Sequence, residues 1–357
     1  MKKLLKASAY FLEEALSLKL DERAQEGKIT FILLNQPPLC DARCKRCFMP
    51  SARRGKIVNP LTLEESKYVL DRAAGYGVLC MEISGEGEPL LSENLLSIIK
   101  HASDLNILTT LITNGHNLSE NIISTFFENK VTLVFSLHTL NKEKYEADNR
   151  LKGSFDIKMK NIELASKTFE NSTEIVNGYE VMRLAVHATL QRDNFEEIAP
   201  LKSFCQERDI FFSVASLAEV GCALENPEIL PDYDIPTIEQ LANMGDNSII
   251  LSHSTKREVG REVCGTCFYG LNIGYDGNLL FDAHAGYEVA GILGNIRTTP
   301  FKELVRRQRI VVKALFTGIH GYCPVRDDDW QDFLNGVLSG KTVLFEEGYA
   351  KVGTSRF

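Results

Sequence analysis

The sequence predicts an α/β protein with a partial, open (β/α)6 TIM-like barrel and a C-terminal α+β extension that contains a β-hairpin. Three observations support this fold class. Short apolar runs alternate with amphipathic segments six times between residues 29 and 216, which predicts parallel strands with right-handed crossovers. Six such units are too few to close an ordinary barrel of about eight strands. After about residue 217 the alternation stops and a hairpin pattern follows.

The N-terminal segment, residues 1–28, is predicted to be an amphipathic helix. Its basic start resembles a signal peptide, but Glu13 and Glu14 interrupt it before a long apolar run develops. No stretch reaches the roughly 18 apolar residues that indicate a membrane helix, so no membrane span is expected. Nine cysteines without a secretory signal predict reduced thiols and a cytoplasmic protein.

The predicted barrel spans residues 29–217, and its first strand, 29–34, leads directly into a cysteine-rich loop. The helix after this loop is expected to begin at a capping box formed by Thr62 and Glu65. The remaining strands are predicted at 78–84, 106–113, 130–136, 179–190 and 210–216, and the remaining helices at 92–105, 120–129, 154–170 and 195–208.

The C-terminal part, residues 218–357, is predicted to be a separate domain. It opens with a segment rich in Asn, Pro, Ser and Asp, which favours irregular structure. Residues 269–281 predict a hairpin with Asp276 and Gly277 at its turn. A helix is expected to follow from about Pro300, because proline suits the first helical turn.

The charge of the chain bears on its partners. The 357 residues carry a net charge of -8 at pH 7, whereas binding to a nucleic-acid backbone needs a basic surface. We therefore expect neither a nucleic-acid nor a membrane partner. A local basic cluster surrounds the cysteine loop and consists of Arg43, Lys45, Arg46, Arg53, Arg54 and Lys56.

The cysteine loop contains Cys40, Cys44 and Cys47 in the spacing C-x3-C-x2-C. Thiolates are soft ligands that bind zinc or iron–sulfur clusters. Because a structural zinc site takes four protein ligands, three thiolates better fit a cubane cluster whose fourth iron stays open for catalysis. The alternative is a non-catalytic zinc-binding protein in which a distant residue supplies the fourth ligand.

This spacing, followed by the aromatic Phe48 on the loop after the first strand of a partial barrel, resembles the radical S-adenosylmethionine (SAM) superfamily. The resemblance implies that the three cysteines bind a [4Fe-4S] cluster whose open iron chelates SAM. It also implies reductive cleavage of SAM to a 5′-deoxyadenosyl radical that abstracts hydrogen from the substrate. An electron donor such as flavodoxin or ferredoxin is implied as a partner.

Short motifs at the ends of the predicted strands extend the resemblance over residues 29–216. They are SGEGEP at 84–89, TNG at 113–115, SLH at 136–138, NRLKGSFD at 149–156 and ATLQRDNFEEI at 188–198. By resemblance, Glu88 binds the methionine ammonium of SAM and Arg150 its carboxylate. His138 departs from the aspartate that family members often have there. The implied SAM contacts are Phe48, Gly85, Gly87, Glu88, Thr113, Asn114, Ser136, Arg150 and Leu190.

The C-terminal part holds further cysteines. Cys264 and Cys267 form a C-x2-C pair just before the predicted hairpin. The segment resembles the twitch and SPASM auxiliary-cluster domains of many radical SAM enzymes, although Phe281 stands where those groups usually have another cysteine. The resemblance implies a second iron–sulfur cluster. Its preferred ligand set is Cys222, Cys264, Cys267 and Cys323, and Cys205 is an alternative ligand.

The sequence therefore predicts a radical SAM oxidoreductase, or a related modifying enzyme, that acts on a small molecule or a peptide. Oxidation of an alcohol or amino group would use the auxiliary cluster as electron acceptor. Epimerisation is the alternative, with a thiol of Cys222 or Cys205 returning a hydrogen atom. Peptide crosslinking is a third outcome, but the first 28 residues do not resemble a leader-binding element.

Overall fold

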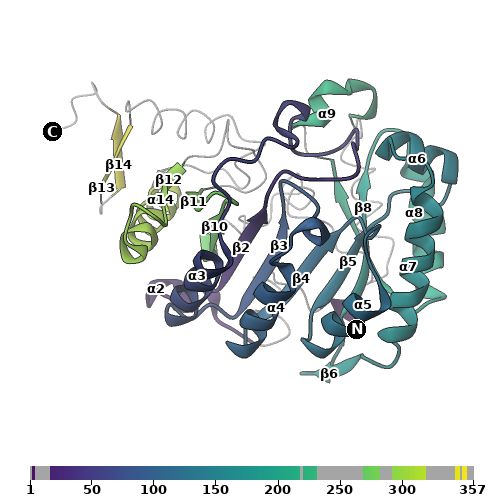
Figure 1. The fold of residues 1–357 in the computed structure, drawn as a ribbon. Helices are drawn as coiled ribbons and strands as arrows, with labels where there is room; N and C mark the ends of the chain where they lie inside the picture. Colours follow the sequence, from purple (N-terminus) through teal and green to yellow (C-terminus); the bar gives the residue numbers. More distant parts are fainter. Residues whose placement is uncertain are drawn as a thin grey trace.

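The computed structural model describes seven stretches of the chain: residues 2–4, 17–217, 220–230, 268–281, 292–318, 342–345 and 348–351. At their centre is a nine-stranded sheet in the order β12-β11-β10-β2-β3-β4-β5-β8-β9. The strands from β2 to β9 in this order all pair in parallel. This arrangement, with helices on the outer face (Figure 1), confirms the predicted partial barrel.

The six parallel strands lie close to their predicted positions, and so do the connecting helices, except that the helix at residues 142–149 was not predicted. The strands are β2 (Phe31–Gln36), β3 (Cys80–Gly85), β4 (Leu108–Thr113), β5 (Thr132–Ser136), β8 (Leu184–Leu190) and β9 (Phe211–Ser216). The helices are α3 (Leu63–Gly75), α4 (Leu95–Asp104), α5 (Glu120–Glu128), α6 (Lys142–Asn149), α7 (Ser154–Thr168) and α8 (Ile198–Gln206). Among the described residues, four short 3₁₀-helices are η1 (Ser51–Arg53), η2 (Pro89–Leu91), η3 (Phe195–Glu197) and η4 (Pro227–Ile229), and a short α-helix is α9 (Cys222–Glu225).

Local sequence explains where the first of these helices starts. Thr62 Oγ1 accepts from the backbone N–H of Glu65 at 3.2 Å, and the Glu65 carboxylate accepts from the backbone N–H of Thr62 at 2.9 Å. Both halves of the predicted capping box are therefore present. This cap fixes the direction in which the chain leaves the long cysteine loop and enters α3.

The predicted single strand 179–190 is wrong, because the structure divides it into β7 (Tyr179–Met182) and β8. The division falls at Arg183, whose guanidinium donates to the carbonyl of Phe127 and lies over the Phe127 and Phe169 rings. β7 leaves the barrel sheet and pairs with β6 (Glu174–Val176) in a small separate sheet. A continuous apolar pattern does not reveal such a change of sheet.

The predicted N-terminal helix over residues 1–28 is also wrong in part. Residues Lys2–Leu4 form strand β1, which pairs in parallel with β7, and the described helix is the short α2 (Leu20–Gln25). Leu4 is buried against Met182, Val134 and Phe211. The gain from burying this leucine favours a strand over a solvated helix end, and the small sheet closes the amino end of the barrel.

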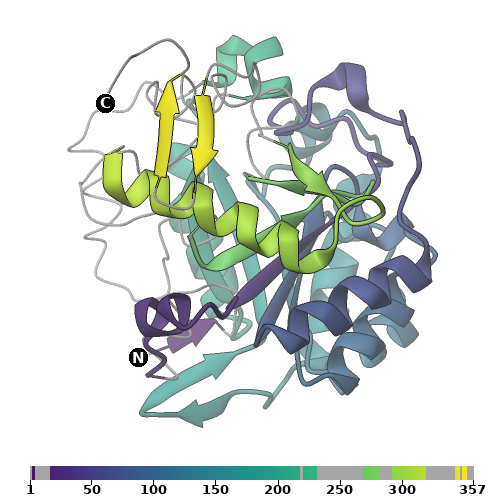
Figure 2. The ribbon, with the colours of Figure 1, turned by 90° about the vertical axis from the view of Figure 1, so that its left-hand side faces the viewer.

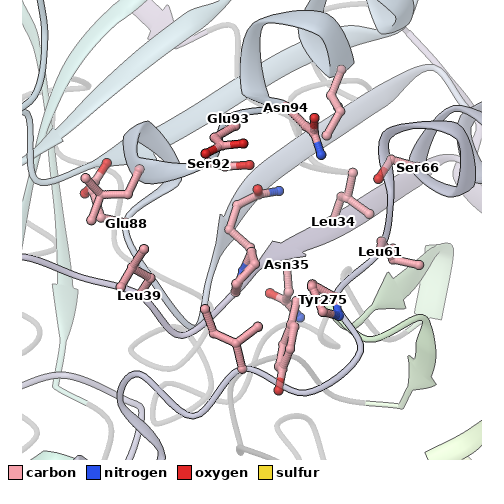
Figure 3. Close-up of a pocket in the computed structure, with 16 residues that line it drawn as sticks. Leu34, Asn35, Leu39, Leu61, Ser66, Glu88, Ser92, Glu93, Asn94 and Tyr275 are labelled. Atoms are coloured by element: carbon pink, nitrogen blue, oxygen red, sulfur yellow. The ribbon is translucent and has the colours of Figure 1, made fainter.

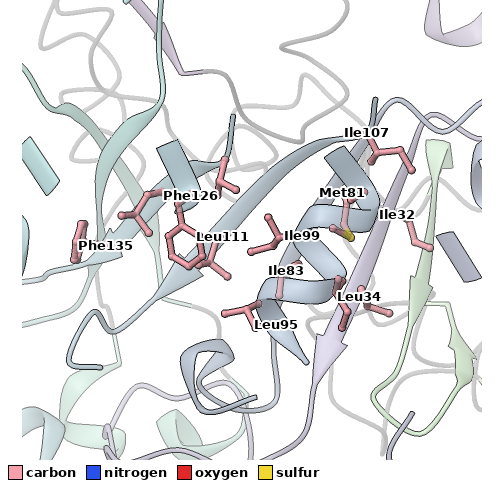
Figure 4. Packing of buried hydrophobic residues seen from close by; sticks show 14 of the residues in the cluster. Ile32, Leu34, Met81, Ile83, Leu95, Ile99, Ile107, Leu111, Phe126 and Phe135 are labelled. Carbon is pink, nitrogen blue, oxygen red and sulfur yellow. The ribbon is translucent and has the colours of Figure 1, made fainter. Parts of the chain in front are cut away.

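The hydrophobic core lies between the sheet and its outer helices (Figure 4). Met81 and Ile83 of β3 pack there against Leu95 and Ile99 of α4. Because side chains alternate along a strand, Glu82 points to the opposite, concave face of the sheet. The same alternation places Thr110, Ser136, His187 and Ser213 on this concave face.

The C-terminal hairpin continues the barrel sheet. Strand β10 (Gly270–Ile273) pairs in parallel with β2, and β11 (Asn278–Leu280) and β12 (Ile292–Asn295) follow in antiparallel pairing. The predicted division at residue 218 therefore does not coincide with a break in the sheet. Helix α14 (Phe301–Gly318) packs against β12 and against the pair formed by β13 (Thr342–Phe345) and β14 (Gly348–Lys351), as Figure 2 shows. Among the described helices, none combines the length and apolarity needed to cross a bilayer.

Candidate functional site

The three-cysteine loop leaves the carboxyl end of β2, the edge of the sheet where parallel α/β proteins place their sites. Its three cysteines form no disulfide, and as residues they are partly exposed. Two backbone bonds tie the loop to the end of α6, from Arg43 N to Asn149 O at 2.9 Å and from Lys45 N to Asp148 O at 3.0 Å. The loop is therefore held from behind by a helix of the barrel.

A glycine-containing turn after β3 packs closely against this loop. A Cβ atom on Gly87 would lie 2.0 Å from the carbonyl oxygen of Pro37, and one on Gly85 would lie 2.8 Å from the amide nitrogen of Gln36. The backbone N–H of Glu88 donates to the carbonyl of Leu39 at 2.8 Å. Only glycine leaves room for this approach, which brings Glu88 beside the cysteines.

Glu88 joins two of the motifs that the sequence singles out. Its Oε1 accepts from Thr113 Oγ1 at 2.5 Å and from the Leu90 backbone N–H at 3.1 Å, and its Oε2 accepts from the Asn114 backbone N–H at 2.7 Å. Burial nevertheless raises the pKa of Glu88 to about 7, because it disfavours the charged form more than these donors stabilise it. A cation placed beside this carboxylate would therefore be attracted strongly.

A chain of polar side chains supports the loop at Cys40. Asp41 accepts from Asn114 Nδ2 at 2.6 Å, and its other oxygen lies 3.3 Å from His116 Nδ1. The second ring nitrogen of His116 lies 2.9 Å from the Tyr145 hydroxyl. Burial opposes ionisation of Asp41, but the bonds from His116 and Asn114 outweigh it and lower its pKa to about 2. The sequence did not single out Asp41, His116 or Tyr145, although Asp41 follows Cys40 and His116 follows the TNG motif.

The middle cysteine, Cys44, faces the end of α6. Its Sγ lies 3.1 Å from Asn149 Oδ1, which also accepts from Arg46 Nη2 at 2.7 Å. Burial raises the pKa of the Cys44 thiol, while the positive charge of Arg46 opposes this. The Asn149 Nδ2 atom is buried and has no hydrogen-bond partner within the described stretches.

The third cysteine, Cys47, is covered by α9. The Cys222 backbone N–H donates to Cys47 O at 2.8 Å, and the Cys222 thiol lies 3.0 Å from the carbonyl oxygen of Met49. The interaction between the Cys47 and Cys222 thiols raises the pKa of Cys47 and lowers that of Cys222. A Cβ on Gly221 would lie 2.1 Å from Phe48 O, so glycine is needed for this contact.

The other predicted SAM contacts lie around the same edge, with different outcomes. Ser136 ends β5, and its carbonyl accepts from Lys158, a fully buried lysine of α7 that the sequence analysis missed. Burial lowers the pKa of Lys158 to about 7. Arg150 has left-handed backbone (φ 50°) and donates to Asn226 Oδ1 at 2.8 Å. Its guanidinium therefore faces the α9 segment rather than the Glu88 cluster.

Leu190 and His138 lie deeper. Leu190 ends β8 with its side chain in the core, and its carbonyl accepts from Leu217 N at 3.0 Å. His138 is 4% exposed, and its Nδ1 accepts from the Thr189 backbone N–H at 2.7 Å. Burial lowers the pKa of His138 well below its usual value, so this histidine is a neutral support for the end of β8.

The remaining cysteine predictions have separate outcomes. Cys205 is fully buried in the core between the sheet and the helices, away from the concave face. Cys222 packs against the first cysteine loop, as described above. Cys264, Cys267 and Cys323 lie outside the described residues, so the predicted auxiliary ligand set stays a prediction.

A cavity of about 270 Å³ lies beside Glu88 (Figure 3). Its walls come from the end of β2, the start of α4, and the segment that leads into α3, and Tyr275 of the hairpin turn forms one side. The Tyr275 hydroxyl donates to the carbonyl of Lys56 at 3.3 Å and lies 3.4 Å from the Val58 N–H. The C-terminal hairpin thus contributes to the surroundings of Glu88.

The donor set can be tested against a metal centre. Among the described residues, no group of three or more His, Cys, Asp or Glu side chains is close enough to hold one metal ion. A single zinc ion needs ligands that converge on one point, whereas an iron–sulfur cluster takes its thiolates on different iron atoms. Three free thiols on one loop therefore fit a cluster better than a zinc ion.

Comparisons with known proteins agree with this site. Residues 34–192 match the profile of the Radical SAM superfamily. The PqqA peptide cyclase of Bradyrhizobium diazoefficiens is 30% identical over 213 residues, 59% of this chain and 51% of that protein. The GTP 3',8-cyclase of Ectopseudomonas mendocina is 27% identical over 202 residues, 56% of this chain and 57% of that protein. The match thus spans little more than half the length of these curated relatives.

A solved structure gives the same fold. The crystal structure of Streptococcus suis SuiB bound to precursor peptide SuiA superposes with a TM-score of 0.60 and 19% sequence identity. The superposition covers 80% of this chain and 67% of the SuiB chain. The profile match, the partial barrel and the cysteine loop beside Glu88 lead to one conclusion. This chain contains a Radical SAM superfamily domain at residues 34–192.

Proposed function

We propose that this protein is a radical SAM enzyme that modifies a peptide by abstracting a hydrogen atom from it. One observation carries the enzymatic part of the proposal. The loop of Cys40, Cys44 and Cys47 packs against the turn of Glu88, which binds the Thr113–Asn114 turn. The peptide is supported by the names of two similar proteins, PqqA peptide cyclase and SuiB bound to a precursor peptide.

In this proposal each group at the site has a distinct task. Cys40, Cys44 and Cys47 hold the cluster as thiolates, and the bound cluster and SAM supply the one-electron chemistry. Glu88 binds the methionine ammonium of SAM, because its oxygens are already oriented by Thr113 and the backbone. An ammonium ion there would offset the burial that now raises the pKa of Glu88.

The other predicted SAM contacts stay part of the proposal. Phe48, Gly85, Gly87, Ser136 and Leu190 surround the same edge of the sheet. Arg150 needs a side-chain rotation away from Asn226 before it can pair with a carboxylate. Because polar side chains of the concave face lie just inside this edge, we propose that they face the substrate. His187 and Ser213, joined by a 2.8 Å contact, lie on that face.

The positions of Cys205 and Cys222 bear on their two predicted roles, which are hydrogen donor and ligand of an auxiliary cluster. A hydrogen donor must reach the substrate, but Cys205 lies fully buried on the helix side of the sheet. Cys222 contacts the loop of the first cluster, which favours a role in that loop over one in a second cluster. We therefore propose Cys264, Cys267 and Cys323 as the remaining candidate ligands of an auxiliary cluster that would accept an electron from the substrate radical.

Anaerobic reconstitution tests the enzymatic part. The wild-type chain should bind iron and sulfide, absorb broadly in the visible range, and release 5′-deoxyadenosine from SAM after reduction by dithionite. Each of C40A, C44A and C47A should lose SAM cleavage completely. C80A is the matched control, because the Cys80 thiol is buried in β3 away from the loop, and it should keep cleavage. Zinc without iron in the wild type would refute the proposal.

A deuterium-transfer experiment tests the substrate class. The reconstituted enzyme is incubated with SAM and with deuterated short peptides encoded beside its gene, and GTP is tested in parallel because one relative is a GTP cyclase. Deuterium in 5′-deoxyadenosine from a peptide supports the proposal. Transfer from GTP alone would overturn the peptide assignment and leave the SAM chemistry in place.

A further inference from the structure

Asn149 occupies a buried position directly behind the cysteine loop. It is the last residue of α6 and 3% exposed, and its backbone carbonyl holds Arg43 of the loop. Its side-chain oxygen, Oδ1, accepts from Arg46 and lies 3.1 Å from Cys44 Sγ. The other end of the same amide, Nδ2, is buried without a hydrogen-bond partner among the described residues.

This arrangement suits a protonated Cys44 and not a thiolate. A thiol can donate its proton to the Asn149 oxygen, but a metal-bound thiolate has no proton to donate. The oxygen would then face the lone pairs of the sulfur at 3.1 Å, while the amide nitrogen, Nδ2, has no partner in the part of the chain that the structure describes. A half-turn about the Cβ–Cγ bond of Asn149 exchanges the two atoms, places the amide N–H beside the Cys44 sulfur and moves the oxygen away from the sulfur lone pairs.

The surroundings allow this half-turn. Arg46 loses its acceptor and has to turn its Nη2 away from the amide nitrogen, but its Nη1 already lies 3.9 Å from the carboxylate of Asp148 and keeps an anionic neighbour. Cys40 offers a comparison, because the side-chain nitrogen of Asn114 lies 3.9 Å from its sulfur. One cysteine of the loop thus already has an amide donor beside it, and Asn149 can supply the second.

We propose that Asn149 is a positioning residue that donates an amide hydrogen bond to the Cys44 thiolate of the loaded loop and raises the reduction potential of the cluster. This inference rests on the proposed function. Reduction adds negative charge to the cluster, and a hydrogen-bond donor at a ligand sulfur stabilises the added charge. Asn149 would therefore make the electron that cleaves SAM easier to deliver.

A redox titration followed by electron paramagnetic resonance tests this role. N149L removes the amide donor and keeps a side chain of similar size. N149A also removes the donor and serves as the second variant if the leucine variant does not fold. Both variants should shift the midpoint potential of the reconstituted cluster to more negative values. N149Q keeps an amide and should shift it less. N272L is the matched control, because Asn272 is equally buried but lies on β10, and it should leave the potential unchanged.

The outcomes separate the inference from the proposed function. A wild-type chain that takes up no cluster overturns the proposed function itself. A loaded wild type with the same potential in N149L or N149A overturns only the role of Asn149. An equal shift in N272L would also overturn it, because a general loss of packing would then explain the change.

Discussion

The carboxylate of Glu88 is 5% exposed and accepts three hydrogen bonds, from Thr113, Leu90 and Asn114. Its pKa is nevertheless raised from 4.5 to about 7, because burial outweighs these donors. The donors around Glu88 are oriented toward a carboxylate anion, whereas the burial of the group opposes its negative charge. This imbalance has a measurable consequence for stability.

We expect the SAM-free chain to lose stability as the pH rises from about 4.5 to about 7. In this window the folded state keeps the Glu88 proton and the unfolded state has released it, so the free energy of unfolding falls as the pH rises. Above about pH 7 both states have released this proton, and Glu88 causes no further change. The gap between the two pKa values corresponds to at most about 3 kcal/mol. Urea unfolding at pH 5 and pH 8 measures the effect.

E88Q provides the comparison for this prediction. The variant cannot titrate at this position, so the change in unfolding free energy between pH 5 and pH 8 should be smaller than in the wild type. The difference between the two proteins isolates Glu88 from all other titrating groups. Identical pH dependence in both would show that Glu88 does not hold its proton to the raised pKa.

Gly87 is the residue on which the approach of the two loops depends. A Cβ there would meet the carbonyl oxygens of Pro37 and Leu39 at 2.0 and 2.5 Å, and neither backbone atom can move aside cheaply. G87A should therefore destabilise the chain by about 3 kcal/mol or more and reduce iron uptake. Thermal unfolding and iron analysis measure the two effects.

G75A is the matched control for this substitution. Gly75 lies in α3, and an added Cβ would meet no atom within 4 Å. Alanine favours helix over glycine by roughly 1 kcal/mol, so G75A should keep or slightly raise stability. A G87A protein as stable as G75A would contradict the close packing of the loops.

The sequence predicted the site residues whose chemistry a compact motif reveals and missed the contacts that only the fold creates. Cys40, Cys44 and Cys47 share one loop, so their spacing alone indicates a shared metal. Asn149 and Lys158 reach the same place from α6 and α7, about a hundred residues further along the chain. Only the folded barrel brings them together, and an asparagine or a lysine on a helix is ordinarily a surface residue.

At the scale of elements, α9 acts as a short cover on the cysteine loop. Its contacts include the bond from Cys222 N to Cys47 O and the bond from Ser51 N to Glu225 Oε1 at 2.9 Å. Asn226 adds a contact of 3.5 Å to Lys45 O. A helix of four residues cannot be stable alone, so the loop and α9 stabilise each other.

The sequence predicts the end of a helix or strand correctly where a local cap or a glycine determines that end. The Thr62 capping box was predicted and is present, because both partners lie within one turn. The change of sheet at Arg183 and the strand Lys2–Leu4 were not predicted, because each depends on a partner far away in the sequence. Periodicity reports the burial of a segment but not the sheet that buries it.

Arg297 connects the C-terminal hairpin to the start of α3. Its guanidinium binds both carboxylate oxygens of Glu65, at 2.6 and 2.8 Å, and donates to the carbonyls of Asn59, Pro60 and Asp276. Lysine cannot reproduce this planar fork, so R297K should destabilise the chain. Because the side chains of this pair remain 30% exposed, we expect a loss of about 1 kcal/mol after solvent screening, measured by urea unfolding.

R306K is the control for the Arg297 prediction. Arg306 binds Glu303 within α14 itself, so this pair connects no separate elements. Exposed pairs of this kind contribute roughly 0.5 kcal/mol or less, and R306K should unfold nearly like the wild type. Equal losses in R297K and R306K would mean that the connection across elements adds nothing.

At the scale of the whole molecule, the hairpin and the cysteine loop share one strand. β2 carries the loop at its carboxyl end, and β10 pairs with β2 along residues Phe31–Leu34. Without β10, β2 would become the exposed edge of the barrel sheet, and apolar residues such as Leu271, Leu279 and Phe281 would leave the core. We therefore expect the family domain at residues 34–192 to depend on a segment outside it.

A truncated chain tests this dependence. A chain that ends at residue 230 keeps every strand from β2 to β9 but lacks β10 and α14, so it exposes both the β2 edge and part of the core. We expect it to aggregate or to lose cooperative unfolding in circular dichroism. A chain that ends at residue 318 keeps β10, β11, β12 and α14 and should unfold cooperatively. If the shorter chain folded as well as the longer one, the barrel would be independent of the hairpin, and the cysteine loop would need no support from the C-terminal part.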